Sequence, residues 1–176
     1  MNSKVTHINV GNLAENCWFL ANEDTKEAVV IDPGAEPDRI CAAAEKHGWK
    51  ITAILLTHGH IDHMGACESL RTELGVKVYA LTEEEDLLLD AKKNLSVFIE
   101  RKVVTFEPDE LLRDGQELTL AGMKIQVIHT PGHTPGGCSY YVADAGCVFS
   151  GDTLFAESVG RSDFPGGSTS ALVRAV

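Results

Sequence analysis

The chain has 176 residues, of which 44% are hydrophobic and 23% charged, as in an ordinary globular protein. This length predicts a single domain over residues 1–176. The formal net charge of −11 repels phosphate backbones and anionic lipids, so we expect neither nucleic acid nor a membrane as a partner.

The N-terminal half alternates between strand and helix patterns. Strands are predicted at 5–10, 15–22 and 27–32, a helix at 37–47, a strand at 51–56, a helix at 62–74 and a strand at 77–80. Pro33-Gly34 marks a turn, Pro37 suits the first turn of a helix, and Gly75 suits a helix end. The order resembles alternating β and α units.

The C-terminal half is mainly strands. Thr82 is predicted to cap a helix whose first turn holds the acids of residues 83–86. Residues 90–113 carry no clear pattern. Further on, strands are predicted at 117–120, 123–128, 138–142 and 147–149, and a helix at 169–176. This order predicts two packed sheets with helices outside them.

The cysteines and the apolar runs bear on the compartment. The chain has five dispersed cysteines and no C-x-x-C pair, which is typical of free thiols in a reducing environment. The first residues, MNSKVTHINVGN, lack the apolar run of a signal peptide, and no later run is long enough to cross a bilayer. We therefore expect a cytoplasmic protein.

The sequence T-H-G-H-I-D-H at 57–63 directly follows an apolar strand. Histidines two apart in extended chain point the same way, so His58 and His60 can share one ion. Asp62 and His63 lie where the chain turns into a helix and can face a second ion. Such a mixture of imidazoles and carboxylates suits zinc, iron or manganese.

Two later motifs add further candidates. His133 lies in T-P-G-H-T-P-G-G at 130–137, and Asp152 lies in S-G-D-T at 150–153, each just after a predicted strand. Loops at strand ends commonly gather into one site. A solvated histidine-rich turn would explain residues 57–63 alone, but the combination favours a metal centre.

The ordered motifs H-x-H-x-D-H, P-G-H-T-P-G and S-G-D-T resemble those of the metallo-β-lactamase-fold superfamily. The phrase L-F-A-E-S-V-G-R-S-D-F-P-G-G at 154–167 is similar to compact bacterial members of its glyoxalase II (hydroxyacylglutathione hydrolase) branch. The resemblance spans about Val5 to about Ser170. It implies an α/β (α+β) fold, a four-layer αββα sandwich of two mixed β-sheets with helices on the outside.

The resemblance also implies a metal-ligand set of one or two Zn²⁺ ions, with iron or manganese as alternatives. The first ion would take His58, His60 and His133; the second would take Asp62 and His63; Asp152 would bridge both. Ile31-Asp32-Pro33-Gly34 resembles the structural turn under the site. His7, His47 and His129 match no ligand position.

The family places a further histidine on the second ion, after the final helix of this chain. No such residue occurs before Val176, so we expect a domain incomplete at its C-terminus, with the last strand and helix elements missing. An exposed sheet edge of that kind favours aggregation or a homodimer.

The function implied by the resemblance is hydrolysis of a small-molecule thioester by a metal-bound hydroxide. Asp62 and Asp152 would orient the attacking water as well as bind metal. Arg161 is a candidate contact for a substrate carboxylate. Its alternative is an ion pair inside the turn of residues 160–163.

Other functions stay open at this point. Persulfide dioxygenases of the same superfamily use one iron, and the equivalent ligands here would be His58, His133 and Asp152. β-Lactam hydrolysis and RNA processing are weaker alternatives, because no export signal is visible and the charge is acidic. The chain could also be a truncated, catalytically impaired metal-binding fragment.

Overall fold

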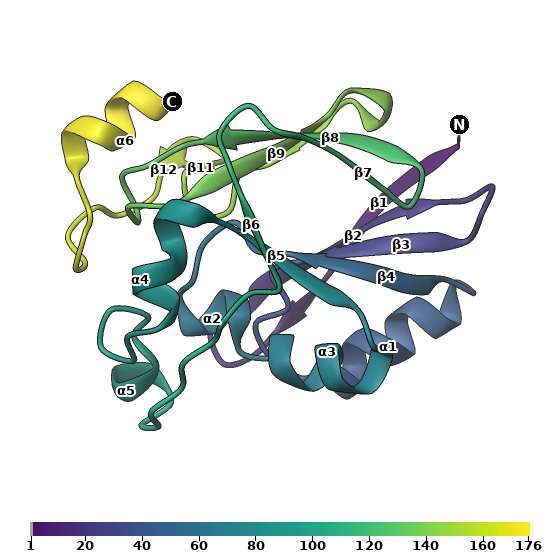
Figure 1. Cartoon of the computed structure of the whole chain (residues 1–176), viewed down its shortest axis with the longest axis horizontal. Helices are drawn as coiled ribbons and strands as arrows, with labels where there is room; N and C mark the ends of the chain where they lie inside the picture. Colours follow the sequence, from purple (N-terminus) through teal and green to yellow (C-terminus); the bar gives the residue numbers. More distant parts are fainter. Residues whose placement is uncertain (1) are drawn as a thin grey trace.

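The computed structural model describes residues 2–176, and two β-sheets face each other at its centre (Figure 1). The first sheet consists, in spatial order, of β1 (Ser3–Val10), β2 (Glu15–Asn22), β3 (Glu27–Ile31), β4 (Lys50–Leu55), β5 (Lys77–Leu81) and β6 (Glu110–Leu112). It is mixed, because β1 to β3 pair antiparallel and β3 to β6 pair parallel.

The second sheet has the order β10-β9-β8-β7. Its strands are β7 (Glu117–Leu120), β8 (Met123–His129), β9 (Cys138–Val142) and β10 (Cys147–Phe149). All its pairs are antiparallel, where a mixed sheet was expected, because consecutive strands are joined by short connections that cannot cross over. A small hairpin of β11 (Leu154–Phe155) and β12 (Ser158–Val159) follows.

Two apolar cores hold these layers together. One lies between the sheets and includes Leu55 and Tyr140, both fully buried. The other lies between the first sheet and the helices outside it and includes Ile54 and Leu70. Because successive side chains of β4 point to opposite faces, Ile54 and Leu55 enter different cores. The predicted sandwich of two sheets with helices outside is confirmed.

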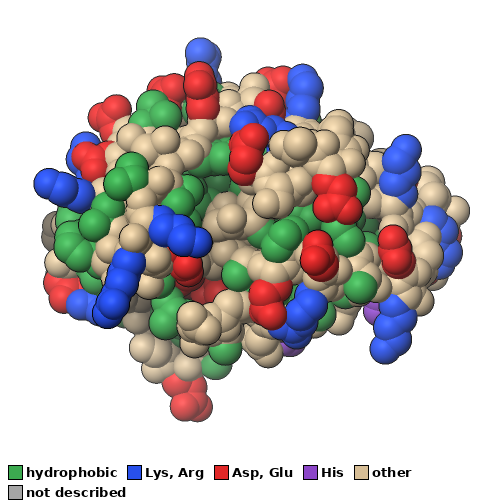
Figure 2. Space-filling model, turned by 90° about the horizontal axis from the view of Figure 1, so that it is seen from below, with side chains coloured by type: hydrophobic (Ala, Val, Ile, Leu, Met, Phe, Trp, Pro, Cys, Tyr) green, Lys and Arg blue, Asp and Glu red, His purple; other side chains and the backbone are tan. Residues whose placement is uncertain are grey.

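The helices are short. They are α1 (Pro37–Lys46), α2 (Ile61–Met64), α3 (Cys67–Leu74), α4 (Glu85–Leu88), α5 (Ser96–Ile99) and α6 (Thr169–Ala175). α1 and α3 cover the outer face of the first sheet (Figure 1), and acidic, basic and hydrophobic side chains are interspersed on the face seen from below (Figure 2). In the described chain, no helix is long and apolar enough to span a membrane.

The single helix predicted at 62–74 is wrong, because the chain forms two helices separated by Gly65 and Ala66. The amide of Ala66 donates to the carbonyl of Pro33 at 2.9 Å. A Cβ on Gly65 would lie 2.3 Å from the carbonyl oxygen of Gly34, so only glycine permits this contact. The turn at 33–34 therefore interrupts the helix and fixes the position of α2.

The predicted cap at Thr82 is also wrong. Its hydroxyl donates to the carbonyl of Leu112 at 2.8 Å and accepts from no amide of the helical turns that follow. A 3₁₀ turn, Thr82–Glu84, comes first and α4 follows it. Of the acids expected in that first helical turn, Glu84 is buried, with a relative exposure of 1%. This residue has a different role, described below.

Candidate metal centre

The six predicted metal ligands come from three connections that meet at one edge of the sandwich. His58 and His60 follow β4, and Asp62 and His63 lie on α2. His133 lies between β8 and β9, and Asp152 lies between β10 and β11. The structure therefore brings together residues that are up to 94 positions apart (152 − 58).

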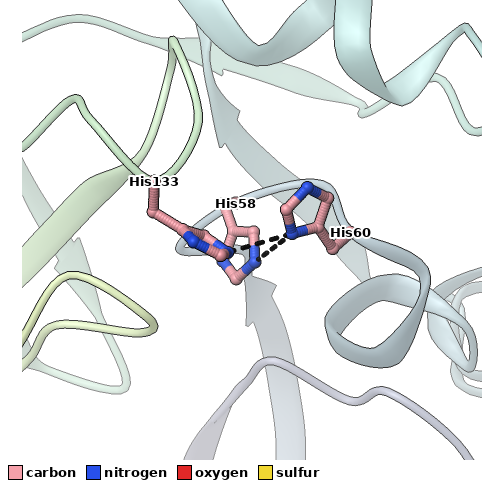
Figure 3. A group of neighbouring side chains, drawn as sticks. All are labelled: His58, His60 and His133. Carbon is pink, nitrogen blue, oxygen red and sulfur yellow. Dashed lines mark hydrogen bonds between the residues drawn. The ribbon is translucent and has the colours of Figure 1, made fainter. Parts of the chain in front are cut away.

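Three imidazole rings converge on one point, which we call the first position (Figure 3). The Nδ1 atom of His60 lies 3.1 Å from Nε2 of His58 and 3.0 Å from Nε2 of His133. All three side chains are buried. Three inward-facing imidazole nitrogens at these separations are a donor set suited to one divalent cation.

The protonation of these rings favours free lone pairs. Burial, with the neighbouring histidines, lowers the pKa of His58 well below its usual value, and burial lowers that of His60 to about 3. Nδ1 of His133 lies 2.8 Å from the carbonyl oxygen of Arg161, which can only accept. Its proton is therefore on Nδ1, and Nε2 presents a lone pair to the first position.

A second cluster surrounds His63, whose side chain is fully buried. Its Nε2 lies 3.4 Å from Asp152 Oδ1 and 3.8 Å from Asp62 Oδ2, and it has no hydrogen-bond partner. We call the space faced by this atom the second position. Burial lowers the pKa of His63, but nearby carboxylates, Asp32 foremost, outweigh burial and raise it well above its usual value.

Asp32 orients His63 from behind. Its Oδ2 lies 3.0 Å from Nδ1 of His63 and accepts from the hydroxyl of Thr57 at 2.6 Å, while its Oδ1 accepts from the amide of Thr57 at 2.8 Å. A carboxylate that holds one ring nitrogen aims the other at a metal. The predicted structural turn at 31–34 thus lies under the site, and its aspartate also fixes the direction of a candidate ligand.

Asp152 lies between the two positions. One of its carboxylate oxygens, Oδ1, is 3.4 Å from His63 Nε2, and the other, Oδ2, is 3.5 Å from His133 Nε2. Burial raises its pKa, but His63 and His133 outweigh burial and lower it, so the group is a carboxylate. A side chain with one oxygen toward each cluster is placed to bridge two ions.

These donors fit a divalent metal. Nε2 of His63, the atom that faces the second position, is buried without a hydrogen-bond partner, and unsatisfied buried polar atoms are rare in folded proteins. Donors bound to one ion at 2.0–2.2 Å lie roughly 3.3–3.6 Å apart when arranged tetrahedrally. The 3.4 Å between His63 Nε2 and Asp152 Oδ1 falls in that range, and the 3.8 Å to Asp62 Oδ2 is slightly longer.

Arg161 does not point its guanidinium at the ligands. Its Nε and Nη2 donate to the two carboxylate oxygens of Asp163 at 2.6 and 2.7 Å, and it stacks on the ring of Phe164 at 3.9 Å. Phe164 in turn lies edge-on to His60, with ring centroids 5.5 Å apart. The ion pair inside the turn is therefore present, and the substrate contact stays a prediction.

The three histidines predicted to lie outside the site belong to none of the described clusters. His7 packs on Trp18, and His47 stacks on Trp49 with ring centroids 4.3 Å apart. Nε2 of His129 lies 2.8 Å from the carbonyl oxygen of Pro135. Contacts of this kind explain each ring without a metal.

Two acids that the sequence did not single out also belong to this region. Glu15, the first residue of β2, lies 3.3 Å from Nε2 of His63 through its Oε2. Glu84 accepts from the amide of Gly59 at 2.8 Å and from the amide of Gly136 at 2.7 Å, joining the two loops that carry the three histidines. No local sequence signal marks either, since one begins an ordinary strand and the other lies in a run of three glutamates.

The buried carboxyl group of Glu84 should make the free energy of unfolding depend on pH. Burial raises its pKa to about 7 from an ordinary 4.5, although the amides of Gly59 and Gly136 lower it. The folded state then binds more protons than the unfolded state, so this contribution is present below about pH 4.5 and is lost as the pH rises through 7. We expect the free energy of unfolding to fall by about 3 kcal/mol from this group.

Urea unfolding in the presence of a chelator, at about pH 5 and about pH 8, measures this change in the wild type and in Glu84→Gln. The glutamine does not titrate, so the variant should show a smaller decrease between the two pH values. Parallel pH dependences in the two proteins would show that Glu84 is not the titrating group.

The comparisons with known proteins agree with the geometry. A chain with two facing sheets and paired histidine–carboxylate clusters at one edge has the architecture of a metal-dependent hydrolase. The sequence-family model of the metallo-beta-lactamase superfamily matches residues 10–175, so the chain belongs to that superfamily.

Two curated relatives are similar over most of the chain. The "Probable metallo-hydrolase YqgX" of Bacillus subtilis is 38% identical over 95% of this chain and 79% of its own length. The "Hydroxyacylglutathione hydrolase GloC" of Haemophilus influenzae is 33% identical over 92% of this chain and 77% of its own length.

Three solved structures share the fold. The BLEG-1 B3 metallo-beta-lactamase has a TM-score of 0.91 and 37% identity, covering 98% of this chain and 83% of its own. TTHA1623 in a di-iron-bound form has a TM-score of 0.84 and 35% identity, and the match covers 97% of this chain and 83% of TTHA1623. ETHE1 from Myxococcus xanthus has a TM-score of 0.75 and 27% identity, and the match covers 99% of this chain and 68% of ETHE1.

Proposed function

We propose that this metal-dependent hydrolase cleaves thioesters, as a hydroxyacylglutathione hydrolase does. The observation that carries the proposal is the placement of Asp152, which presents one oxygen to His63 and the other to His133 at 3.4 and 3.5 Å. Two ions held by one shared carboxylate suit the addition of water to a carbonyl. The 33% identity to a relative named hydroxyacylglutathione hydrolase supports the thioester as substrate.

The protein residues have separate tasks in this proposal. A divalent ion bound here would lower the pKa of a coordinated water from about 15.7 to about 7 and polarise a carbonyl oxygen. Asp62 and Asp152 would accept hydrogen bonds from the attacking water and orient it. Water adds to the carbonyl carbon, the C–S bond breaks, and the proton released by water neutralises the thiolate or passes to solvent. A thiol pKa near 8.5 makes strong acid assistance unnecessary.

Zinc, iron and manganese all suit the donors, and the two positions favour different ions. Three imidazoles at the first position are ordinary zinc ligands, whereas the carboxylates around His63 suit harder cations such as manganese. Arg161 would bind a substrate carboxylate only after releasing Asp163, so the proposal does not depend on it.

The test is a turnover assay on the metal-loaded chain, with metal content measured on the same sample. We expect hydrolysis of S-lactoylglutathione or simpler acyl thioesters to exceed that of a β-lactam such as nitrocefin, and to disappear with a chelator. One iron per chain with oxygen uptake on a persulfide would favour the dioxygenase alternative instead. Full metal loading without thioester cleavage would refute the proposal.

A further inference from the structure

The carboxylate of Glu15 faces the same nitrogen as the two predicted carboxylate ligands of the second position. Oε2 of Glu15 lies 3.3 Å from His63 Nε2, closer than Asp152 at 3.4 Å or Asp62 at 3.8 Å. One donor atom each from Glu15, Asp62 and His63 lies within 4.8 Å of the other two. By distance, Glu15 is as much part of this cluster as either aspartate.

The state of His63 points to a ligand shared by these groups. Its Nδ1 is already engaged by Asp32, and its Nε2 is fully buried without a hydrogen-bond partner. With Nδ1 held by the carboxylate of Asp32, Nε2 is the ring atom left to bind a metal. The carboxylate oxygens around Nε2 repel one another unless a positive charge lies among them, and a divalent cation supplies that charge.

Glu15 reaches the second position from an element far from the predicted motifs. It is the first residue of β2 and pairs with Val10 across the hairpin formed with β1. Its side chain is 20% exposed and lines a cavity of about 300 Å³ together with Asp32 and Gly151.

We propose that Glu15 is a carboxylate ligand of the second metal ion, together with Asp62, His63 and Asp152. This inference rests on the proposed function in one respect, since it assumes the same pair of metal positions. It assigns a ligand from the N-terminal hairpin, whereas Asp152 comes from the connection between β10 and β11. Three carboxylates and one imidazole give this position a harder donor set than the first.

The experiment measures metal uptake by the 176-residue chain without any assay of turnover. The first position is filled with one equivalent of Zn²⁺, and Mn²⁺ is then titrated while the electron paramagnetic resonance signal of free Mn²⁺ is followed. We expect the wild type to take up a second ion and Glu15→Gln to bind Mn²⁺ at least roughly tenfold more weakly. Its affinity for the first Zn²⁺ should stay unchanged.

Two further variants make the result specific. Glu27→Gln removes a carboxylate at the opposite end of the β2–β3 pair, where Glu27 faces Asn22 in register, and should bind both ions as the wild type does. Glu15→Asp keeps the charge but shortens the side chain, so its Mn²⁺ affinity should lie between those of the wild type and Glu15→Gln. It also tests the role of Glu15 should the glutamine variant fold poorly.

Three results would overturn the assignment. They are equal Mn²⁺ affinity in Glu15→Gln and the wild type, uptake of a single ion by the wild type, and equal weakening of both ions in a folded variant. Thioester turnover is measured separately. Normal binding of two ions without turnover would refute the proposed function and leave the role of Glu15 standing.

Discussion

Replacing His133 with alanine is expected to weaken binding of the ion at the first position strongly and to slow hydrolysis by orders of magnitude. The ring supplies one of three nitrogens there, at 3.0 Å from His60 Nδ1, and its side chain is only 5% exposed. Even a residue that merely orients a ligand contributes roughly 10- to 100-fold to metal affinity, so losing a ligand should cost more. Several kcal/mol of lost charge stabilisation corresponds to a rate decrease on the order of 10³-fold.

Metal content after gel filtration and steady-state turnover measure the two effects. His47→Ala is the matched control, because His47 stacks on Trp49 at the end of α1 and approaches none of the described ligand clusters. That variant should keep the metal content and the turnover of the wild type. A His133→Ala protein with full metal loading and unimpaired turnover would remove this residue from the metal centre.

Much of the site could be predicted because each motif directly follows a strand pattern. The apolar run before Thr57 predicts a buried strand, and β4 ends at Leu55, so His58 and His60 fall in the connection just beyond it. The same holds for His133 after β8 and Asp152 after β10. Loops at strand ends commonly gather into one site, so the linear positions favoured convergence, and the family resemblance implied the division of the ligands between two ions.

The remainder depends on contacts that no local pattern records. The helix expected at 62–74 breaks because Gly65 packs on the carbonyl of Gly34, and this approach depends on how α2 docks against the turn. Glu84 resembles its exposed neighbours in sequence but is buried by two loops that close over it. Glu15 is an ordinary strand residue until the hairpin places it beside His63. In each case the partner is distant along the chain.

The second large effect is expected from Asp32→Asn, which should weaken metal binding at the second position by roughly 10- to 100-fold. The carboxylate accepts from the amide and hydroxyl of Thr57 and from Nδ1 of His63, so it receives three donors. An asparagine must turn its NH₂ group toward one of them. Facing His63, that group would force the ring proton onto Nε2, the atom that faces the ion.

Comparing Asp32→Asn with Asp32→Ala separates the effect on metal binding from the effect on stability. The backbone at Asp32 has a φ of 54°, a left-handed conformation that asparagine adopts more readily than alanine. The alanine variant also leaves the buried donors of Thr57 without an acceptor, so we expect it to lose about 3 kcal/mol or more of the free energy of unfolding. Asp32→Asn should lose less stability while still binding the second ion weakly.

Urea unfolding measures stability, and the Mn²⁺ titration described for Glu15 measures affinity at the second position. If both variants lost affinity only in proportion to stability, Asp32 would serve the fold alone. If Asp32→Asn bound the second ion as tightly as the wild type, the proton on Nδ1 would not control the lone pair at Nε2. Weak binding in a stable Asp32→Asn protein would show that the turn before α1 acts through the ring of His63, because Asp32 itself lies on the far side of that ring from the ion.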